Sequence, residues 1–328
     1  MVNKERNYCL DIFKGIACIF VVFMHCEFPG KMGTLVQCIS RFCVPFFFMV
    51  SGYFCYNPNG TVKYSKKIIH VLILIIGASL FYLIVTPLWS NVDYIPKEAV
   101  IDWIVFNTPW YIAGQLWFVF ALFYDYILFC VFDKLGLRKI AYILIPVLMI
   151  IYIGLAQGAH LAGIKVPNEY YRNFLIEGFL FFSLGAFLHE YKDRFNEISN
   201  RLLMALIILS TMACPLERMF MNRDFGVNIV TFVQVIAMFV FAVNNPSLGK
   251  NSLMTRFGAE YSMFVYIIHP SVWHLLAKYY SINHLQSNMT AMYLMPVFCV
   301  IITVFVSTVP ILIKKSYRTI KKKRSAQS

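Results

Sequence analysis

Long runs of apolar residues, each near the length needed to cross a membrane, follow one another through most of the chain. A spanning helix needs about 20 mostly apolar residues, whereas a transmembrane barrel would show short alternating segments, which are absent. The pattern therefore predicts an all-α fold, a polytopic transmembrane helical bundle of about ten spans. The predicted spans are residues 9–28, 38–56, 67–89, 114–132, 138–157, 173–190, 201–216, 226–244, 258–279 and 289–313.

The basic residues between these runs predict the orientation. An even number of spans places both termini on the same side of the membrane. With the termini inside, the inner segments hold 20 of the 29 Lys and Arg residues and the outer segments hold 8, with Lys14 inside the first span. Because inner loops are richer in Lys and Arg, both termini are predicted to be cytoplasmic, in a multi-pass protein of the cell inner (plasma) membrane. The longest outer segment, residues 89–113, contains Trp and Tyr residues that suit an interfacial position.

The composition supports a single membrane domain. The chain is 59% hydrophobic and 14% charged, with a mean hydropathy of +0.66, whereas a soluble domain carries about 25% charged residues. The apolar excess runs along the whole length, which predicts one integral membrane domain over residues 1–328 with a basic cytoplasmic tail at residues 314–328. The first apolar run leads directly into further spans without a small-residue cleavage site, so no cleavable signal peptide is expected.

Net charge and cysteine content limit the binding partners, disulfides and metal sites that the sequence predicts. The net charge is +13, but the basic residues lie in short loops and in the tail, which favours contact with membrane lipid over nucleic acid, and no nucleic-acid partner is predicted. Most of the nine cysteines lie inside apolar runs and none forms a CxxC pair. They are predicted to be small buried side chains, and neither disulfides nor a metal site is expected.

Ionisable residues inside the first span are the first candidates for chemistry. The stretch LDIFKGIACIFVVFMHCEF contains Asp11, Lys14 and His25. Lys14 and His25 are 11 positions apart, so on a helix they share a face with about 20° of offset and about 16 Å of axial separation. A charged residue at the centre of a span costs ~3 kcal/mol and usually faces the bundle interior. These residues also have purely structural interpretations. Lys14 could anchor the helix at the membrane interface, and Asp11 could pair with it at i,i+3. His25 could be a buried histidine that hydrogen-bonds a backbone carbonyl.

Other polar residues in apolar runs join this set. In ISRFCVPFFFMVSGYF, Arg41 leads an aromatic run that ends in Ser51 and Gly52, where small residues also permit close helix packing. Asp125 and Glu177 are carboxylates within predicted spans and are candidates on that ground.

The ninth predicted span adds two further candidates. In VYIIHPSVWH, Tyr266 and His269 are predicted to line the same cavity. His274 follows His269 by five positions, which is not the i,i+4 spacing of a metal pair, and no metal is predicted.

Two of these motifs together resemble the acyltransferase-3 family of integral membrane acyltransferases. That family has a basic residue, ten intervening residues and a histidine in its first span, which match Lys14 and His25 in KGIACIFVVFMH. RFCVPFFFMVSGYF is similar to its aromatic second span, although the family's basic position is often Arg, whose bidentate fork Lys lacks. GQLWFVFALFYDYIL, FLFFSLGAFL and YSMFVYIIHPSVW resemble later spans, so the resemblance covers nearly the full length and is nearest to bacterial sugar O-acetyltransferases.

The resemblance implies transfer of an acyl group, usually acetyl, from cytosolic acyl-CoA to a hydroxyl of an envelope glycan or lipid-linked sugar. Acetyl-CoA would be a co-substrate, and no permanently bound cofactor is expected. His25 is expected to act as general base, and an acyl-histidine intermediate stays open. Lys14 and Arg41 are expected to meet negative charge on the donor. The donor and substrate site is further expected to include Ser51, Gly52, Asp125, Glu177, Tyr266 and His269.

Two other functions fit the same span pattern. A transporter or flippase of a glycan-type substrate would also have buried charges, but such proteins often show repeated halves, and no such symmetry is visible. A non-catalytic membrane sensor would share the fold without a working site. The acyl group, acetyl or succinyl, and the acceptor itself stay open at this point.

Overall fold

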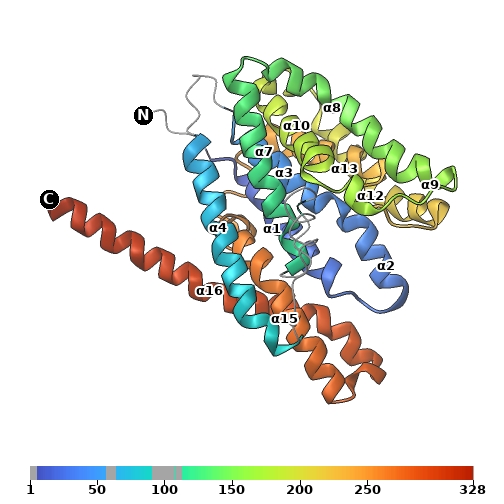
Figure 1. The fold of residues 1–328 in the computed structure, drawn as a ribbon, viewed down its shortest axis with the longest axis vertical. Helices are drawn as coiled ribbons and strands as arrows, with labels where there is room; N and C mark the ends of the chain where they lie inside the picture. Colours follow the sequence, from blue (N-terminus) through green and yellow to red (C-terminus); the bar gives the residue numbers. More distant parts are fainter. Residues whose placement is uncertain (1–5, 57–63, 91–106, 108–112, 328) are drawn as a thin grey trace, which may run out of the picture. The chain divides into compact units, whose positions relative to one another are not determined.

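The computed structural model describes residues 6–56, 64–90, 107 and 113–327, and those residues form helices and connecting turns without a strand (Figure 1). Seven of the described helices are long and apolar enough to cross a membrane: Tyr8–His25, Gly30–Tyr53, Tyr64–Leu88, Gly114–Lys134, Arg138–Leu161, Asn200–Met221 and Met289–Tyr317. The all-α membrane class is thereby confirmed. The predicted interfacial position of residues 89–113 falls mostly outside the described residues.

The other three predicted spans are helical but shorter or less apolar. Residues 173–190 form a π-helix, η6 (Phe174–Gly178), followed by α10 (Phe179–Glu190). Residues 226–244 contain the short apolar helix α13 (Ile229–Asn244), and residues 258–279 lie mainly in α15 (Ser262–Ile282). All ten predicted spans are therefore helical, while the count of ten crossings and the side of the termini stay predictions.

The helices fall into two compact units, described separately below. Unit 1 comprises Met1–Gln37 and Pro246–Ser328. Its helices are α1 (Tyr8–His25), most of α2 (Gly30–Ile39), α14 (Leu253–Glu260), α15 and α16 (Met289–Gln327). Unit 2 comprises Cys38–Asn245. Its helices are η1 (Ser40–Phe42), α3 (Cys43–Tyr53), α4 (Tyr64–Val85), α7 (Trp117–Lys134), α8 (Arg138–Ile153), η6, α10, α12 (Asn200–Met221) and α13.

In unit 1, α1 packs closely on α14. The side chain of Asn7 caps α1 by accepting from the Leu10 amide at 2.8 Å. A Cβ built on Gly258 would collide with the Asp11 carbonyl, and one on Gly15 would lie 2.7 Å from Met254 Sδ. Glycine at both positions lets the two backbones approach, which fixes the face of α1 that carries Asp11.

In unit 2, the tightest helix crossing joins α3 and α10. A Cβ on Gly52 would collide with the Phe182 carbonyl, and a Cβ on Gly185 would collide with the Met49 carbonyl. Both obstacles are backbone atoms, which cannot turn aside as a side chain can. The Ser51–Gly52 pair therefore lies where close helix packing requires a residue without a side chain.

Gly52→Ala is expected to lower the free energy of unfolding of the protein in detergent by about 1–3 kcal/mol, the usual cost of overpacking. Gly77→Ala is the matched control, because a Cβ at Gly77 of α4 meets nothing within 4 Å, and alanine is the better helix former. Thermal unfolding should rank Gly77→Ala at or above the unchanged protein and Gly52→Ala below both. Equal stability of the two variants would show that the α3–α10 crossing tolerates a side chain at residue 52.

Two helices extend beyond the predicted boundaries. The span predicted to end at residue 216 continues to Met221 in α12, since Pro215 is accommodated inside the helix and Asn222 ends it in a left-handed conformation (φ 50°). The last span continues as α16 through Gln327, so the basic tail prolongs the helix instead of leaving it. All nine cysteines are buried, which confirms that part of the prediction.

Candidate functional site

His25 is the last residue of α1, and its ring lies against His269 of α15. The ring centroids are 5.1 Å apart and the ring planes meet at 45°. His25 is exposed whereas His269 is fully buried. The structure thus brings together two of the predicted site residues.

The hydrogen bonding of His269 fixes which of its nitrogens is available. Nδ1 lies 3.0 Å from the carbonyl oxygen of Val265. Because a carbonyl only accepts, Nδ1 carries the proton, and in a neutral ring Nε2 then bears the lone pair. Nε2 is buried and has no hydrogen-bond partner within the described part of the chain. A buried polar atom of this kind calls for an explanation, and a catalytic role is one of the few common ones.

Lys14 lies in the second turn of α1 and forms an ion pair with Asp11. Its Nζ is 2.6 Å from Asp11 Oδ1, the i,i+3 pair that the sequence suggested, and Arg6 Nε donates to Asp11 Oδ2 at 2.7 Å. Asp11 is buried while the Lys14 side chain is 18% exposed. Two cations thus share one carboxylate, which leaves this end of α1 with an excess positive charge.

Arg41 forms an ion pair with a residue far away in the sequence of unit 2. It lies in η1, at the N-terminal end of α3, and forms an ion pair with Asp224, which follows α12. Arg218, in the last turn of α12, approaches the same carboxyl oxygen to 3.1 Å. Gly226, at φ +87°, donates its amide to Asp224 at 3.0 Å and so helps to hold that carboxylate. Two guanidinium groups therefore share Asp224.

Glu177 lies beside a third arginine. It is 2% exposed and lies in η6, and its Oε2 is 3.8 Å from Arg172 Nε. Arg41 also lies within electrostatic range of Glu177. The Arg172 guanidinium stands over the Trp117 ring, 5.3 Å from its centroid. Single-turn π-helices such as η6 occur frequently at functional sites.

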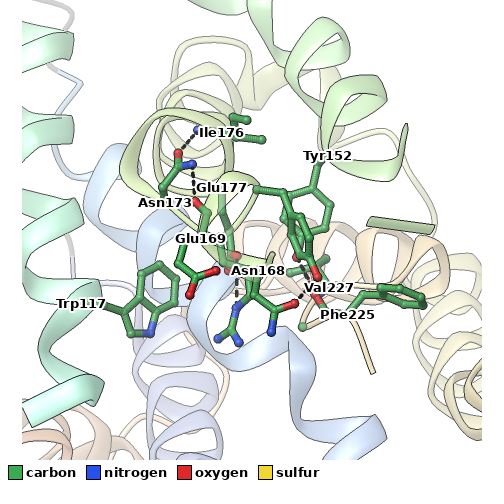
Figure 2. Close-up of polar contacts among 12 residues, drawn as sticks. Trp117, Tyr152, Asn168, Glu169, Asn173, Ile176, Glu177, Phe225 and Val227 are labelled. Carbon is green, nitrogen blue, oxygen red and sulfur yellow. Dashed lines mark hydrogen bonds and ion pairs between the residues drawn. The ribbon is translucent and has the colours of Figure 1, made fainter. Parts of the chain in front are cut away.

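A framework of tyrosine and asparagine side chains surrounds this pair (Figure 2). The Tyr152 hydroxyl donates to the Phe225 carbonyl and accepts from the Val227 amide, both at 3.0 Å. Asn173 accepts from the amides of Leu175 and Ile176, which caps η6. These bonds fix the start of η6 and the loop after α12, the two segments that carry Glu177 and Asp224.

Tyr171 links the arginines of this region. Its ring packs on Tyr152, with centroids 5.3 Å apart, and its hydroxyl donates to Asn168. Burial raises the pKa of the Tyr171 hydroxyl, and Arg223 and Arg172 oppose that shift through their charge. Arg223 therefore belongs to the same electrostatic neighbourhood as Arg172.

The remaining predicted residues are Asp125, Ser51, Gly52 and Tyr266. Asp125 is fully buried in α7 against Gly178, and neither carboxyl oxygen has a hydrogen-bond partner among the described residues. Ser51 donates to the Phe47 carbonyl of its own helix at 2.9 Å, and Gly52 forms the α3–α10 crossing. Tyr266 lies beside His269, with ring centroids 6.2 Å apart.

Sequence reasoning missed a polar cluster at the opposite end of unit 2. Asp133 accepts from the Tyr64 hydroxyl and from Arg138 Nε, both at 2.7 Å, and Glu190 accepts from the Tyr142 hydroxyl at 2.7 Å. Arg138 Nη1 lies 3.7 Å from Glu190 and joins the two pairs. The sequence signal for this cluster was the charged residues at 133–138, between the fourth and fifth predicted spans.

A lysine and a histidine adjoin this cluster. Lys67 donates to the Phe54 carbonyl at 2.8 Å, at the end of α3 that follows the Ser51–Gly52 pair. His189 stacks on Tyr53 with ring centroids 4.2 Å apart. Two polar clusters thus lie at opposite ends of unit 2, one at the start of α3 and one at its end.

Comparison with known proteins identifies the family. A family model described as an acyltransferase domain (Acyl_transf_3) matches residues 7–313. No curated protein and no solved structure matches the chain.

Proposed function

Since the chain belongs to the Acyl_transf_3 family of acyltransferases, we propose that it moves an acyl group, acetyl in the first instance, from cytosolic acyl-CoA to a hydroxyl of a cell-envelope glycan. The His25–His269 contact carries the proposal, because it supplies an exposed imidazole backed by a buried one. The proposed setting is the plasma membrane, with the donor on the cytoplasmic side.

His25 acts as general base in this mechanism. It removes the proton of the acceptor hydroxyl as that oxygen attacks the thioester carbonyl carbon. The carbon–sulfur bond then breaks, the acyl group stays on the acceptor oxygen, and the coenzyme A thiolate leaves. The imidazolium returns its proton to the thiolate, so protons balance without another reactant.

His269 positions His25 and stabilises the charge formed on it. The two rings are in contact, with centroids 5.1 Å apart, so the buried imidazole of His269 lies beside the proposed base. The Val265 carbonyl holds the His269 proton on Nδ1, which reserves the Nε2 lone pair for a donor. The His25 imidazolium would supply that N–H, as in catalytic triads where a third group orients the base.

Lys14 binds the negatively charged donor. Its shared contact with Asp11 and Arg6 leaves excess positive charge at the start of α1, the end predicted to face the cytoplasm. Coenzyme A carries phosphates, which bind cations through charge-assisted hydrogen bonds. About 16 Å of helix separate Lys14 from His25, a span that the pantetheine arm of coenzyme A would bridge.

The first test is acyl transfer by the purified protein in lipid. Radiolabelled acetyl-CoA and a membrane glycan extract are the substrates, with succinyl-CoA as the alternative donor. Label recovered in the extract supports the proposal, and hydroxylamine release of the label shows that the product is an ester. Folded protein that neither binds nor uses either donor contradicts it and favours a transporter or sensor.

Lys14→Met is expected to raise the KM for acetyl-CoA about 10-fold, because a hydrogen bond to a charged group contributes roughly 1.5 kcal/mol or more. The matched control is Lys192→Met, which removes an exposed charge on the side predicted to be cytoplasmic. Steady-state kinetics at saturating acceptor separate the two. The same KM for acetyl-CoA in both variants would show that Lys14 does not bind the donor.

A further inference from the structure

Four arginines gather at one end of unit 2, where the starts of α3, α7 and η6 meet the ends of α8 and α12. Arg41 and Arg218 share Asp224, and Arg172 pairs with Glu177. The fourth, Arg223, lies near the Tyr171 hydroxyl together with Arg172, Glu177 and Asp224. We name Arg41, Arg172, Arg218 and Arg223 the arginine cluster.

Two guanidinium groups of this cluster, those of Arg172 and Arg218, keep a buried N–H donor without a hydrogen-bond partner among the described residues. Each guanidinium has five N–H donors and no acceptor. Arg172 makes no side-chain hydrogen bond to a described residue, and its buried Nε lies 3.8 Å from Glu177, beyond hydrogen-bond range. The buried Nη1 of Arg218 approaches Asp224 to 3.1 Å without hydrogen-bond alignment. Donors that the fold orients but does not satisfy are the feature of a site that accepts an anion.

Nearby carboxylates form ion pairs with these guanidinium groups, but none of the described ones accepts a hydrogen bond from Arg172 Nε or Arg218 Nη1. Asp224 is engaged by Arg41 and by the Gly226 amide. Glu217 accepts from the Gln157 side chain and from the first amides of α13. The Glu169 side chain forms no ion pair within the described residues, and Figure 2 draws it between Trp117 and Asn168.

The cluster also carries a flat aromatic surface. Arg172 covers one part of Trp117, and the Trp117 side chain keeps partial exposure. Side chains with planar polar groups, Asn168 and Glu169, lie beside it (Figure 2). An indole ring gives an apolar face for a sugar ring, and planar amide and carboxylate groups hydrogen-bond paired hydroxyls.

The positive-inside distribution predicts that this end of unit 2 faces outward, since the segments holding Arg41, Arg172, Arg218 and Arg223 are outer segments. The cytosolic donor approaches the membrane from the opposite side. The acceptor of a reaction that modifies the cell envelope approaches from outside.

We propose that the arginine cluster binds the acceptor through an anionic group, a carboxylate or a phosphate carried by a sugar that stacks near Trp117. The proposal rests on the acyltransferase function proposed above and names the class of its acceptor. Arg172 provides the principal fork, with Arg218 adding a second, while Glu177 and Asp224 hold the guanidinium groups in place. Neutral glycans would then bind more weakly than acidic ones.

The test measures binding without any acyl-CoA. The protein is placed in phosphatidylcholine nanodiscs, so that no anionic lipid competes, and calorimetry compares trigalacturonate, glucose 1-phosphate and neutral maltotriose. One of the two anionic sugars is expected to bind at least 10-fold more tightly than maltotriose, which identifies the anion. Arg172→Gln and Arg218→Gln are each expected to weaken that binding about 10–100-fold, the range for a lost charge-assisted hydrogen bond.

Lys165→Gln is the matched control, because Lys165 is an exposed cation on the same predicted side and lies outside the cluster. Equal binding of neutral and anionic sugars overturns the proposal, as does equal weakening by Lys165→Gln and by both arginine variants with unchanged melting temperatures. If the protein binds anionic sugars but transfers no acetyl group, the anion site is supported and the proposed acyltransferase reaction is refuted. If it transfers acetyl groups to glycans without preferring anionic ones, the reaction is supported and the anion site is refuted.

Discussion

His25→Ala is expected to lower kcat for acetyl transfer by about 10²–10⁴-fold, the contribution of a positioned general base. The KM for acetyl-CoA should stay within about twofold, because the donor's charged end is assigned to Lys14, about 16 Å along the same helix. The measurement is label transfer from acetyl-CoA to glycan extract by equal amounts of folded protein. Replacing an exposed residue at the end of α1 should leave thermal stability nearly unchanged.

His70→Ala supplies the control for this experiment. His70 is an exposed histidine of α4, so its loss tests whether removal of any histidine from an apolar helix reduces transfer. We expect its kcat to match that of the unchanged protein. Transfer by His25→Ala at more than a tenth of the normal rate would show that another group takes the proton.

The first helix was predictable because its signals are local. Apolar length set the span, and the helix found is Tyr8–His25 against the predicted residues 9–28. The pairing of Asp11 with Lys14 follows from i,i+3 spacing and is confirmed. The same periodicity placed Lys14 and His25 on one continuous helix, as the structure has them.

Partners from distant helices could not be predicted from spacing. The expected contact of Arg41 with the donor stays a prediction, whereas its ion pair with Asp224, from a loop that follows α12, had no signal in the sequence. The span ending at residue 216 was predicted too short because Glu217 and Arg218 look like a polar boundary. In the fold, Glu217 accepts from the first amides of α13 and Arg218 faces Asp224, so both charges are accommodated and the helix continues.

Local deviations from regular geometry were likewise invisible in the sequence. Apolar periodicity gives no sign of the π-helix at Phe174–Gly178, which depends on the Asn173 cap. Gly52 read equally well as a site residue or as a packing residue, and only the neighbouring Phe182 carbonyl shows why glycine is required there. Features that depend on which helices become neighbours therefore needed the structure.

His269→Leu is expected to lower kcat about 10²-fold with little change in either KM, because the variant keeps the packing volume and removes the acceptor for the His25 imidazolium. His269→Gln should retain more activity than His269→Leu, since its side-chain carbonyl still accepts a hydrogen bond. Adding His269→Leu to His25→Ala should cost little more, as expected of two groups that act as one unit.

A purely structural role for His269 would give a different set of results. Its burial alone predicts that both His269 variants lose thermal stability and activity in parallel. Positioning of His25 instead predicts a changed tautomer of the His25 ring, visible in the nitrogen chemical shifts of labelled histidine, together with the Gln rescue. His274→Leu, one turn further along α15 with its ring against Trp273, should leave those shifts unchanged. Unaltered His25 shifts in His269→Leu would show that the two rings pack together without sharing a proton.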